Sequence, residues 1–323
     1  QPPQSFDNGL VAPDTGKMFE RLEEYLSQSK KLYPKTIQEQ SVLDFTRTTE
    51  YLCNSNGVDL ESSQGIYNFM SMFTTKDGKK SSSFNYSAIS LKTLEKDLLS
   101  CSSINTLLRQ SAEQLDTKSV SGKFTGDIIV TPDCLRDFLY FITEWAIRDR
   151  LLIAGTSVYK DKLDQQIASI GFTVHSKPVS DEIAGGYFIT PDGYKANNLT
   201  IIDRGALKTF ILSLYGAQKT GLKRVSNCGG CYVVDPGNKS FDELVKSIKK
   251  GLLVARFSGG MPNENGDFSG VAKNSYYIEN GKIQYPICET MISGNIPSMF
   301  LSISGISRER VDFGTHIFPW ISF

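Results

Sequence analysis

Residues 37 to 90 alternate apolar side chains with Thr, Ser and Asn, a two-residue period that a helix cannot use. Turn-forming pairs interrupt this alternation at Asn56-Gly57 and at Asp77-Gly78. Successive side chains of a β-strand point to opposite faces, and Asn-Gly or Asp-Gly favours tight reversals between strands. The segment therefore predicts a run of antiparallel strands joined by hairpins.

The second half of the chain repeats this strand signal at several places. The string SYYIENGKIQYPI places Asn280-Gly281 between two runs of strand-forming residues, which predicts a hairpin with a type I′ turn. GYFIT and NLTIID flank a Pro191-Asp192-Gly193 turn, and DIIV begins at Asp127. We therefore expect the C-terminal part to consist mainly of antiparallel sheet with flanking helices.

Helices are predicted where apolar side chains recur at helical spacing. The first ends before Pro34, the third begins after Thr131-Pro132, and the last two are expected to end at Gly221 and Gly251. The predicted helical ranges are 16–32, 91–118, 135–152, 207–219 and 241–250. Together these elements predict an α+β protein with a domain boundary near residue 120.

Composition excludes two classes of partner. Lys and Arg number 35, as do Asp and Glu, so the chain as a whole does not attract polyanions. No run approaches the roughly 18 apolar residues that a membrane helix needs, and the first thirty residues lack a signal-peptide pattern. We expect no nucleic-acid or membrane partner.

The six cysteines are scattered through a long chain, which is typical of reduced thiols and predicts a cytoplasmic protein. Cys228 and Cys231 have the spacing of half a zinc knuckle or of a redox pair, but a knuckle needs a second pair. Only Cys288 and His175 are available to complete one. His316 is the only other histidine, so the chain has little material for a zinc hydrolase site, which usually takes two or three imidazoles.

One long segment resembles a known signature. Residues 266 to 295 read GDFSGVAKNSYYIENGKIQYPICETMISGN and resemble the TldD/PmbA, or modulator of DNA gyrase, family. RGALKTFILSLYGAQKTGLKRVSNCGG and LDQQIAS upstream resemble other family stretches in the same order. The resemblance implies an intracellular peptidase family, with a partial N-terminal α/β domain over 1–120 and a C-terminal β-rich domain of mainly antiparallel sheet over 121–323. Members extend further on the N-terminal side.

Catalytic TldD-type members carry His-Glu-x-x-x-His on a helix and a cysteine near the C-terminus. In this chain Thr143 and Arg148 stand where the two histidines would be, and Phe313 stands in the place of the cysteine. Arginine is a permanent cation, threonine is a weak ligand, and phenylalanine has no donor atom. The resemblance therefore implies a PmbA/TldE-like branch without its own metal, with zinc only in a TldD-type partner.

Glu144 is the only family catalytic residue retained, and it has two interpretations. Without a metal-bound water to deprotonate, an i,i+4 ion pair with Arg148 on a polar helix face is the simpler one. For binding peptide or partner, the candidates come from the glycine-rich loops and the signature strands. They are Gly229, Gly230, Gly259, Gly260, Asp267, Phe268, Ser269 and Tyr277.

Three functions follow as hypotheses. The first is a non-catalytic subunit that forms a heterodimer with a TldD-like homologue and helps to bind peptide substrate for proteolysis or maturation. The second is an independent peptidase that uses Glu144 or an unrecognised metal site. The third is a homodimeric peptide-binding protein. Serine-hydrolase and nucleotide-binding functions are not supported, because the chain has neither a Gly-x-Ser-x-Gly elbow nor a P-loop ending.

Overall fold

The computed structural model describes residues 4–323, which divide into two compact units. Unit 1 contains the chain up to Leu115 together with Lys177–Asn198 and Asp312–His316. Unit 2 contains Asp116–Ser176, Leu199–Val311 and Ile317–Phe323. The predicted α+β class is confirmed, with mainly antiparallel sheets and flanking helices. Within the described residues, no helix has both the length and the apolar character that crossing a bilayer requires.

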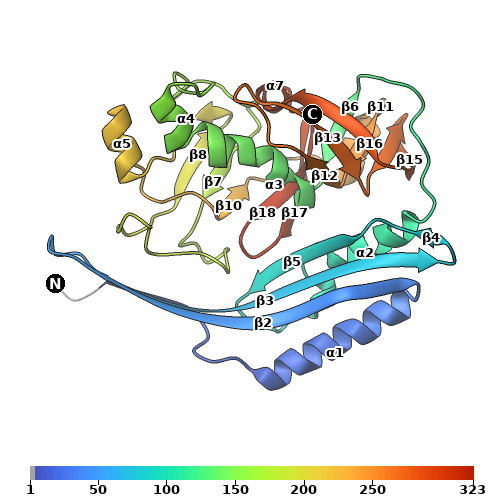
Figure 1. Ribbon diagram of the computed structural model, residues 1–323, viewed down its shortest axis with the longest axis horizontal. Coiled ribbons are helices and arrows are strands. Elements are labelled where there is room, and N and C mark those ends of the chain that lie inside the picture. The colour runs from blue at the N-terminus through green and yellow to red at the C-terminus, as the bar shows by residue number, and fades with distance from the viewer. Residues whose placement is uncertain (1–3) are drawn as a thin grey trace. The chain divides into compact units, whose positions relative to one another are not determined.

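Unit 1 is built on the predicted antiparallel run, and Figure 1 shows its two long strands side by side. Its five-stranded sheet has the order β1-β3-β2, with β4 and β5 also paired to β3. Gly57 and Gly78 adopt positive φ at the two predicted turns. The strands are β1 (Gln4–Gly9), β2 (Thr36–Cys53), β3 (Asp59–Asp77), β4 (Lys80–Ser81) and β5 (Asn85–Leu91).

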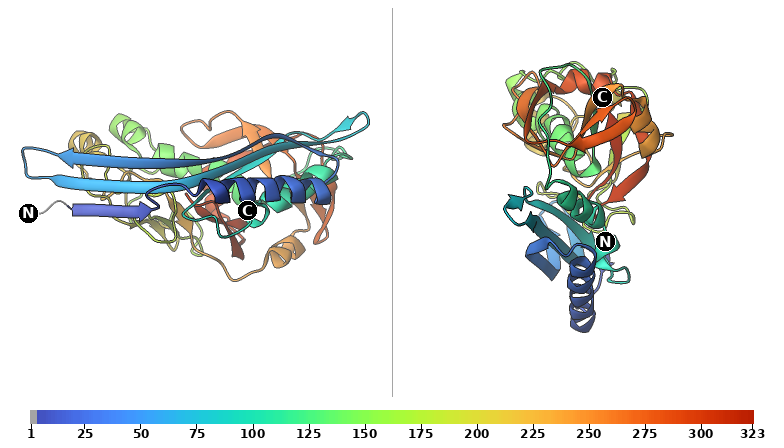
Figure 2. Two further views of the ribbon diagram at one scale, coloured as in Figure 1. Left: turned by 90° about the horizontal axis from the view of Figure 1, so that it is seen from below. Right: turned by 90° about the vertical axis from the view of Figure 1, so that its right-hand side faces the viewer.

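Two helices of unit 1 share one hydrophobic core with β3, and α1 runs along the sheet in Figure 2. Helix α1 (Thr15–Leu32) begins at Asp14, whose carboxylate accepts from the backbone N–H of Lys17 at 2.9 Å. The helix predicted over 91–118 is shorter, because only η1 (Leu98–Ser100) and α2 (Ile104–Glu113) are helical. The apolar side chains at helical spacing in this range are all buried: Leu94, Leu98, Leu99, Ile104, Leu107 and Leu108.

The strands of unit 2 form a mixed ten-stranded sheet in the order β15-β14-β11-β6-β18-β10-β7-β8-β9, with β17 paired to β18. The predicted hairpin at Asn280-Gly281 is confirmed, with both turn residues at positive φ. The bounds are β6 (Asp127–Val130), β7 (Val174–Ser176), β8 (Leu199–Asp203), β9 (Ala206–Leu207), β10 (Tyr232–Val234), β11 (Lys250–Val254), β14 (Tyr276–Glu279), β15 (Lys282–Pro286), β17 (Gly305–Asp312) and β18 (Ile317–Ser322).

A second, three-stranded sheet in unit 2 joins β12 (Arg256–Gly259), β13 (Asp267–Lys273) and β16 (Thr290–Asn295) in that order. Helix α3 (Pro132–Tyr140) lies beside β12, and its phenylalanine Phe138 packs against Phe257 and Phe268. The remaining helices of unit 2 are short: α4 (Asp149–Ala154), α5 (Leu214–Thr220), α6 (Phe241–Ser247) and α7 (Ile296–Leu301).

The continuous helix predicted over 135–152 is wrong. After α3 the chain forms a π-helical turn, η2 (Phe141–Ala146), and α4 begins only at Asp149. The carbonyl of Ile147 accepts from the backbone N–H of Ile211 at 2.8 Å, and Arg148 has an extended backbone that bridges to the same residue. This non-local pairing takes the place of the helical hydrogen bond to Ile147. π-helical turns are often found at functional sites.

Two other helix boundaries also differ from the prediction. The helix predicted over 207–219 begins late, because Ser213 caps it by accepting from the Gly216 N–H at 3.1 Å. It ends at Gly221 as expected. Helix α6 does not reach Gly251, which lies in β11, where an added Cβ would come within 2.2 Å of the Asp127 carbonyl oxygen. Gly251 therefore allows β11 to lie close to β6, and it does not end a helix.

Candidate functional site

The retained Glu144 lies in η2 and is held by two side chains. Its Oε2 atom is 2.5 Å from Nη2 of Arg148, and the Tyr232 hydroxyl on β10 donates to Oε1. Arg148 also donates from Nε to the carbonyl of Thr143 at 3.1 Å. The predicted Glu144–Arg148 ion pair is confirmed. Its predicted place on a polar face is wrong, because both side chains are only about a quarter exposed (26% and 28%).

The local electrostatics favour a charged Arg148 and a protonated Tyr232 beside Glu144. Burial opposes the charge of Arg148, but the neighbouring Glu144 and Tyr232 outweigh it, so the pKa of the guanidinium is raised. Burial, reinforced by Glu144, raises the pKa of the Tyr232 hydroxyl. The hydroxyl therefore stays a hydrogen-bond donor at neutral pH. Each carboxylate oxygen of Glu144 is engaged by one of these partners, which is the geometry of a structural ion pair.

We expect Arg148→Ala to lower the free energy of unfolding of unit 2 by about 2 kcal/mol, between the values for exposed and buried pairs. The loss arises because Glu144 would remain partly buried without its cation. Both tryptophans, Trp145 and Trp320, lie in unit 2, so denaturant unfolding followed by tryptophan fluorescence measures this unit. The control is Arg308→Ala, which breaks an exposed pair with Glu243 and should cost under about 0.5 kcal/mol. Equal losses would contradict the argument.

The Cys228-Gly-Gly-Cys231 loop packs on this ion pair. Gly229 has φ +78°, and a Cβ built there would lie 2.5 Å from Nη2 of Arg148 and 2.9 Å from the Tyr232 hydroxyl. Gly230 has φ +75° and open space around a built Cβ. The first glycine therefore makes room for the arginine, whereas the second serves only the backbone turn.

The cysteines of that loop are not joined by a disulfide. Burial raises the pKa of Cys231 to about 12, which works against the thiolate that metal binding and redox chemistry need. His175, considered above as a further ligand, instead contacts Thr200 through Nδ1 at 2.9 Å and Asp235 through Nε2 at 3.2 Å. Within residues 4–323, no three His, Cys, Asp or Glu side chains gather closely enough to hold a metal ion.

The three residues predicted to stand at ligand positions do not fit zinc. The Thr143 hydroxyl donates a hydrogen bond to the Leu139 carbonyl at 3.2 Å, and the Arg148 guanidinium forms an ion pair with Glu144. Phe313, in unit 1, is buried and stacks on His316 at 4.5 Å between ring centroids. An aromatic hydrocarbon, a cation and a weak hydroxyl do not make the donor set that zinc takes in proteins.

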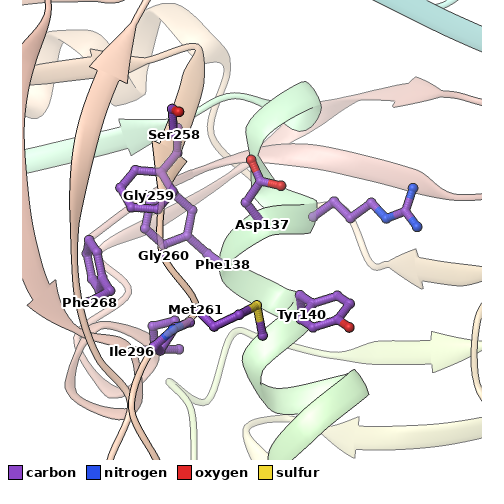
Figure 3. Close-up of a pocket in the computed structure, with 12 residues that line it drawn as sticks. Asp137, Phe138, Tyr140, Ser258, Gly259, Gly260, Met261, Phe268 and Ile296 are labelled. Carbon is purple, nitrogen blue, oxygen red and sulfur yellow. The ribbon is translucent and has the colours of Figure 1, made fainter.

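A pocket of about 440 Å³ opens beside α3 in unit 2. Figure 3 shows Asp137, Phe138 and Tyr140 of α3 on one side, with Ser258 to Met261 of β12 and the loop after it on the other. Aromatic and aliphatic side chains supply most of the wall. The lining residues are Arg136, Asp137, Phe138, Tyr140, Phe257, Ser258, Gly259, Gly260, Met261, Pro262, Phe268 and Ile296.

The carboxyl of Asp137 is the acidic group of this pocket. Asp137 is exposed but lines the pocket, and desolvation raises the pKa of its carboxyl to about 6. The charges of Arg256 and Arg136 partly offset this effect. A carboxyl held above its ordinary pKa in a concave, largely apolar site is typical of ligand-binding sites.

The raised pKa of Asp137 predicts a pH-dependent cost to stability. An unfolded Asp has a pKa of about 3.9, so between about pH 4 and pH 6 the folded state binds more protons, and stability falls as pH rises. We expect Asp137→Asn to stabilise unit 2 at pH 7.5 by up to about 1 kcal/mol, discounted for solvent access. The gain should disappear below about pH 4. Tryptophan-monitored unfolding across pH checks this, and a gain independent of pH would contradict it.

The structure separates the other predicted binding residues. Gly259, Gly260 and Phe268 line the pocket, whereas Gly229 and Gly230 belong to the Cys228-Gly-Gly-Cys231 loop. Asp267 accepts from Asn263 at 3.0 Å and Asn295 at 2.9 Å, and these bonds lower the pKa of its carboxyl. This arrangement holds the loop between β12 and β13.

Ser269 and Tyr277 lie outside the pocket. Ser269 is exposed on β13, next to the buried Phe268. Tyr277 is buried in the ten-stranded sheet and stacks on Tyr285 at 5.3 Å between ring centroids. The residues predicted to bind peptide or partner therefore do not form a single site.

Three residues of these sites are absent from the sequence predictions: Tyr232, Asp137 and Tyr140. Tyr232 is 88 positions from Glu144 in the chain, so no local pattern joins them. Asp137 lies within the helix predicted over 135–152, and the pocket forms only because β12 and its loop lie opposite. A polar residue between apolar helix positions is the only available signal, and it is not specific.

Comparison with solved structures shows which class of proteins has this fold. The crystal structure of TldE from Thermococcus kodakarensis superposes with a TM-score of 0.80 at 17% identity, covering 100% of this chain and 77% of that one. A modulator of DNA gyrase from Thermotoga maritima gives 0.81 at 20% identity with the same coverages. The fold is therefore that of the TldE and modulator-of-gyrase proteins.

Sequence comparison then gives the family. A family model described as the PmbA/TldA metallopeptidase C-terminal domain matches residues 121–323. A metalloprotease PmbA from Escherichia coli O157:H7 is 31% identical over 185 residues, which cover 52% of this chain and 40% of that protein. A PmbA homologue from Buchnera aphidicola of Acyrthosiphon pisum is 41% identical over 166 residues, 49% of this chain and 37% of the relative. The chain belongs to the PmbA/TldD metallopeptidase family and spans less than half of the length of these curated relatives.

Proposed function

We propose that this chain is a non-catalytic, PmbA/TldE-like subunit of a TldD-type metallopeptidase assembly that acts on peptides in the cytoplasm. The observation that carries the proposal is the Glu144–Arg148–Tyr232 cluster, in which an ion-paired guanidinium stands at a family histidine position. In this proposal zinc belongs to the TldD-like partner, and this chain contributes binding surface for peptide and partner.

Chemistry supports a binding role over a hydrolytic one. A metallopeptidase lowers the pKa of a bound water and needs a carboxylate with a free oxygen to take its proton. Among the described residues no metal-binding group of His, Cys, Asp or Glu forms at Glu144, and Arg148 and Tyr232 already engage its two oxygens. Sheet edges remain suited to holding an extended peptide through main-chain hydrogen bonds.

The test is elemental analysis together with peptide cleavage, on the purified chain alone and then mixed with a His-Glu-x-x-x-His homologue from the same organism. We expect no stoichiometric zinc and no cleavage by the chain alone, and faster cleavage in the mixture than by the homologue alone. An Arg148→Ala variant should leave the metal content of this chain unchanged.

An independent peptidase is the second candidate, favoured by the metalloprotease names of the curated relatives. Stoichiometric zinc with cleavage by the chain alone would establish it and overturn the subunit proposal. Failure to form a complex with the homologue, together with a stable homodimer of this chain in sedimentation, would instead support a self-associating peptide-binding protein.

A further inference from the structure

We propose that the pocket between α3 and β12 binds an extended peptide segment by pairing with β12 and by enclosing one large apolar side chain of that peptide. This inference deepens the proposed function, because it names the binding surface and the class of side chain that the surface selects. The argument depends on residues of unit 2 only.

The pocket is lined for an apolar group. Three phenylalanine rings pack against one another at its base, with centroid distances of 5.3 Å for Phe138–Phe268, 5.4 Å for Phe138–Phe257 and 5.5 Å for Phe257–Phe268. Met261 and Ile296 add aliphatic surface. The volume, about 440 Å³, falls in the range of ligand pockets. An aromatic or branched aliphatic side chain entering it would leave water for an apolar surface.

The main chain beside the pocket has the geometry of a sheet edge. Among the described residues, β12 is an end strand, paired only with β13. An end strand directs the N–H and C=O of every second residue away from its one neighbouring strand. Ser258 and Gly259 are consecutive residues of β12 and both line the pocket, so one of the two presents its main-chain groups at that edge. An incoming extended chain can exchange hydrogen bonds there.

The two glycines at this edge have different roles. A Cβ at Gly259 would lie 2.6 Å from the Phe257 ring and 2.8 Å from the Ser269 carbonyl oxygen, so glycine is needed for the packing of the protein itself. At Gly260 a Cβ would meet nothing within 4 Å, and its φ lies outside the left-handed range. No atom of the protein therefore occupies the space beside Gly260, which lines the pocket.

The rim adds polar groups to this apolar site. Asp137 supplies a carboxyl and Tyr140 a hydroxyl, both from α3, opposite the β12 edge. A carboxylate facing a peptide main chain accepts an amide N–H that the edge strand does not reach. The site thus combines main-chain pairing, an apolar cavity and one acceptor, which together fit a peptide better than a small polar metabolite.

Gly260→Val tests this proposal, because valine would fill the room at the pocket with little strain in the fold. The control is Gly171→Val, in the same unit, where a Cβ also has open space and φ is also outside the left-handed range. The probes are two end-blocked hexapeptides, acetyl-Ser-Ala-Phe-Ala-Ser-Ala amide and its Phe→Ala counterpart. Binding to the isolated chain is measured by calorimetry, with circular dichroism to check folding.

We expect the Phe peptide to bind the wild-type chain about tenfold or more tightly than the Ala peptide, as burial of an aromatic side chain implies. Gly260→Val should weaken binding of the Phe peptide by about tenfold or more, and Gly171→Val should change it less than about twofold. Equal binding of the two peptides, or undiminished binding by a folded Gly260→Val protein, would overturn the proposal.

A second measurement keeps the test valid if the valine variant does not fold. In the wild-type chain with ¹³C-labelled methyl groups, the Met261 and Ile296 signals should shift on addition of the Phe peptide, and the signal of Met70, in unit 1, should not. Unchanged Met261 and Ile296 signals at saturation would overturn the proposal. Binding without partner-dependent cleavage would count against the subunit proposal alone, and partner-dependent cleavage without binding here would count against the pocket alone.

Discussion

Alanine at position 229 is expected to destabilise unit 2 by about 2 to 3 kcal/mol, whereas alanine at position 230 should cost about 1 kcal/mol. Both residues adopt a left-handed backbone, φ +78° and +75°, so both substitutions carry the same conformational strain. Only at Gly229 does the added methyl group meet Nη2 of Arg148 and the Tyr232 hydroxyl. The difference between the two variants therefore isolates the contact with the ion-pair cluster.

The end of a long arginine side chain usually moves aside at low cost. Here Arg148 is held by Glu144 at 2.5 Å and by the Thr143 carbonyl at 3.1 Å, so moving it breaks contacts that are partly buried. We expect a double-mutant cycle to show this coupling. In an Arg148→Ala background, Gly229→Ala should cost less than it does in the wild type, and the contact with the Tyr232 hydroxyl at 2.9 Å accounts for the remaining excess over Gly230→Ala. An unchanged penalty in that background would show that strain elsewhere in the loop is responsible.

Local patterns predicted those elements whose stabilising contacts are close in the chain. Helix α1 has its cap at Asp14 and its apolar stripe within one segment, and the Asn280-Gly281 hairpin is specified by its own turn. The Glu144–Arg148 pair is predictable for the same reason, as its members are four residues apart. Each of these features depends on short-range geometry that a single sequence displays.

Features that depend on distant segments were not predictable. The break in the helix at Ile147 arises because its carbonyl accepts from Ile211, more than sixty residues away. Gly251 looks like a helix end in the sequence, yet it permits the close approach of β11 to Asp127 on β6. In both cases tertiary pairing overrides a local signal, which propensity alone does not reveal.

The candidate site also combines features that depend on neighbouring residues with features that depend on distant segments. The sequence predicts that Thr143 and Arg148 stand where catalytic members have histidines, and neither side chain suits a zinc donor set. The Glu144–Arg148–Tyr232 cluster is visible only in three dimensions, because Tyr232 comes from a strand and Gly229, which packs on it, comes from a loop. The pocket beside α3 is likewise assembled from segments far apart in the chain.

The largest loss of stability is expected from Phe138→Ala, about 3 to 5 kcal/mol. Phe138 is 2% exposed and packs edge-on against Phe268 at 5.3 Å and tilted against Phe257 at 5.4 Å, so its removal leaves a cavity between α3 and the three-stranded sheet. Tryptophan-monitored denaturation of unit 2 measures the loss.

Tyr140→Ala is the matched control for this cluster. Tyr140 lies on the same helix and lines the same pocket, but it is 39% exposed and should cost under about 1 kcal/mol. A large loss for Phe138→Ala with a small one for Tyr140→Ala would show that the pocket's base belongs to the core while its rim does not. Comparable losses would mean that the rim is also part of the core, and rim residues could then not be varied to test binding without disturbing the fold. A rigid base with a tolerant rim is the arrangement that a preformed binding pocket requires, because the base keeps its shape whether or not a ligand is bound.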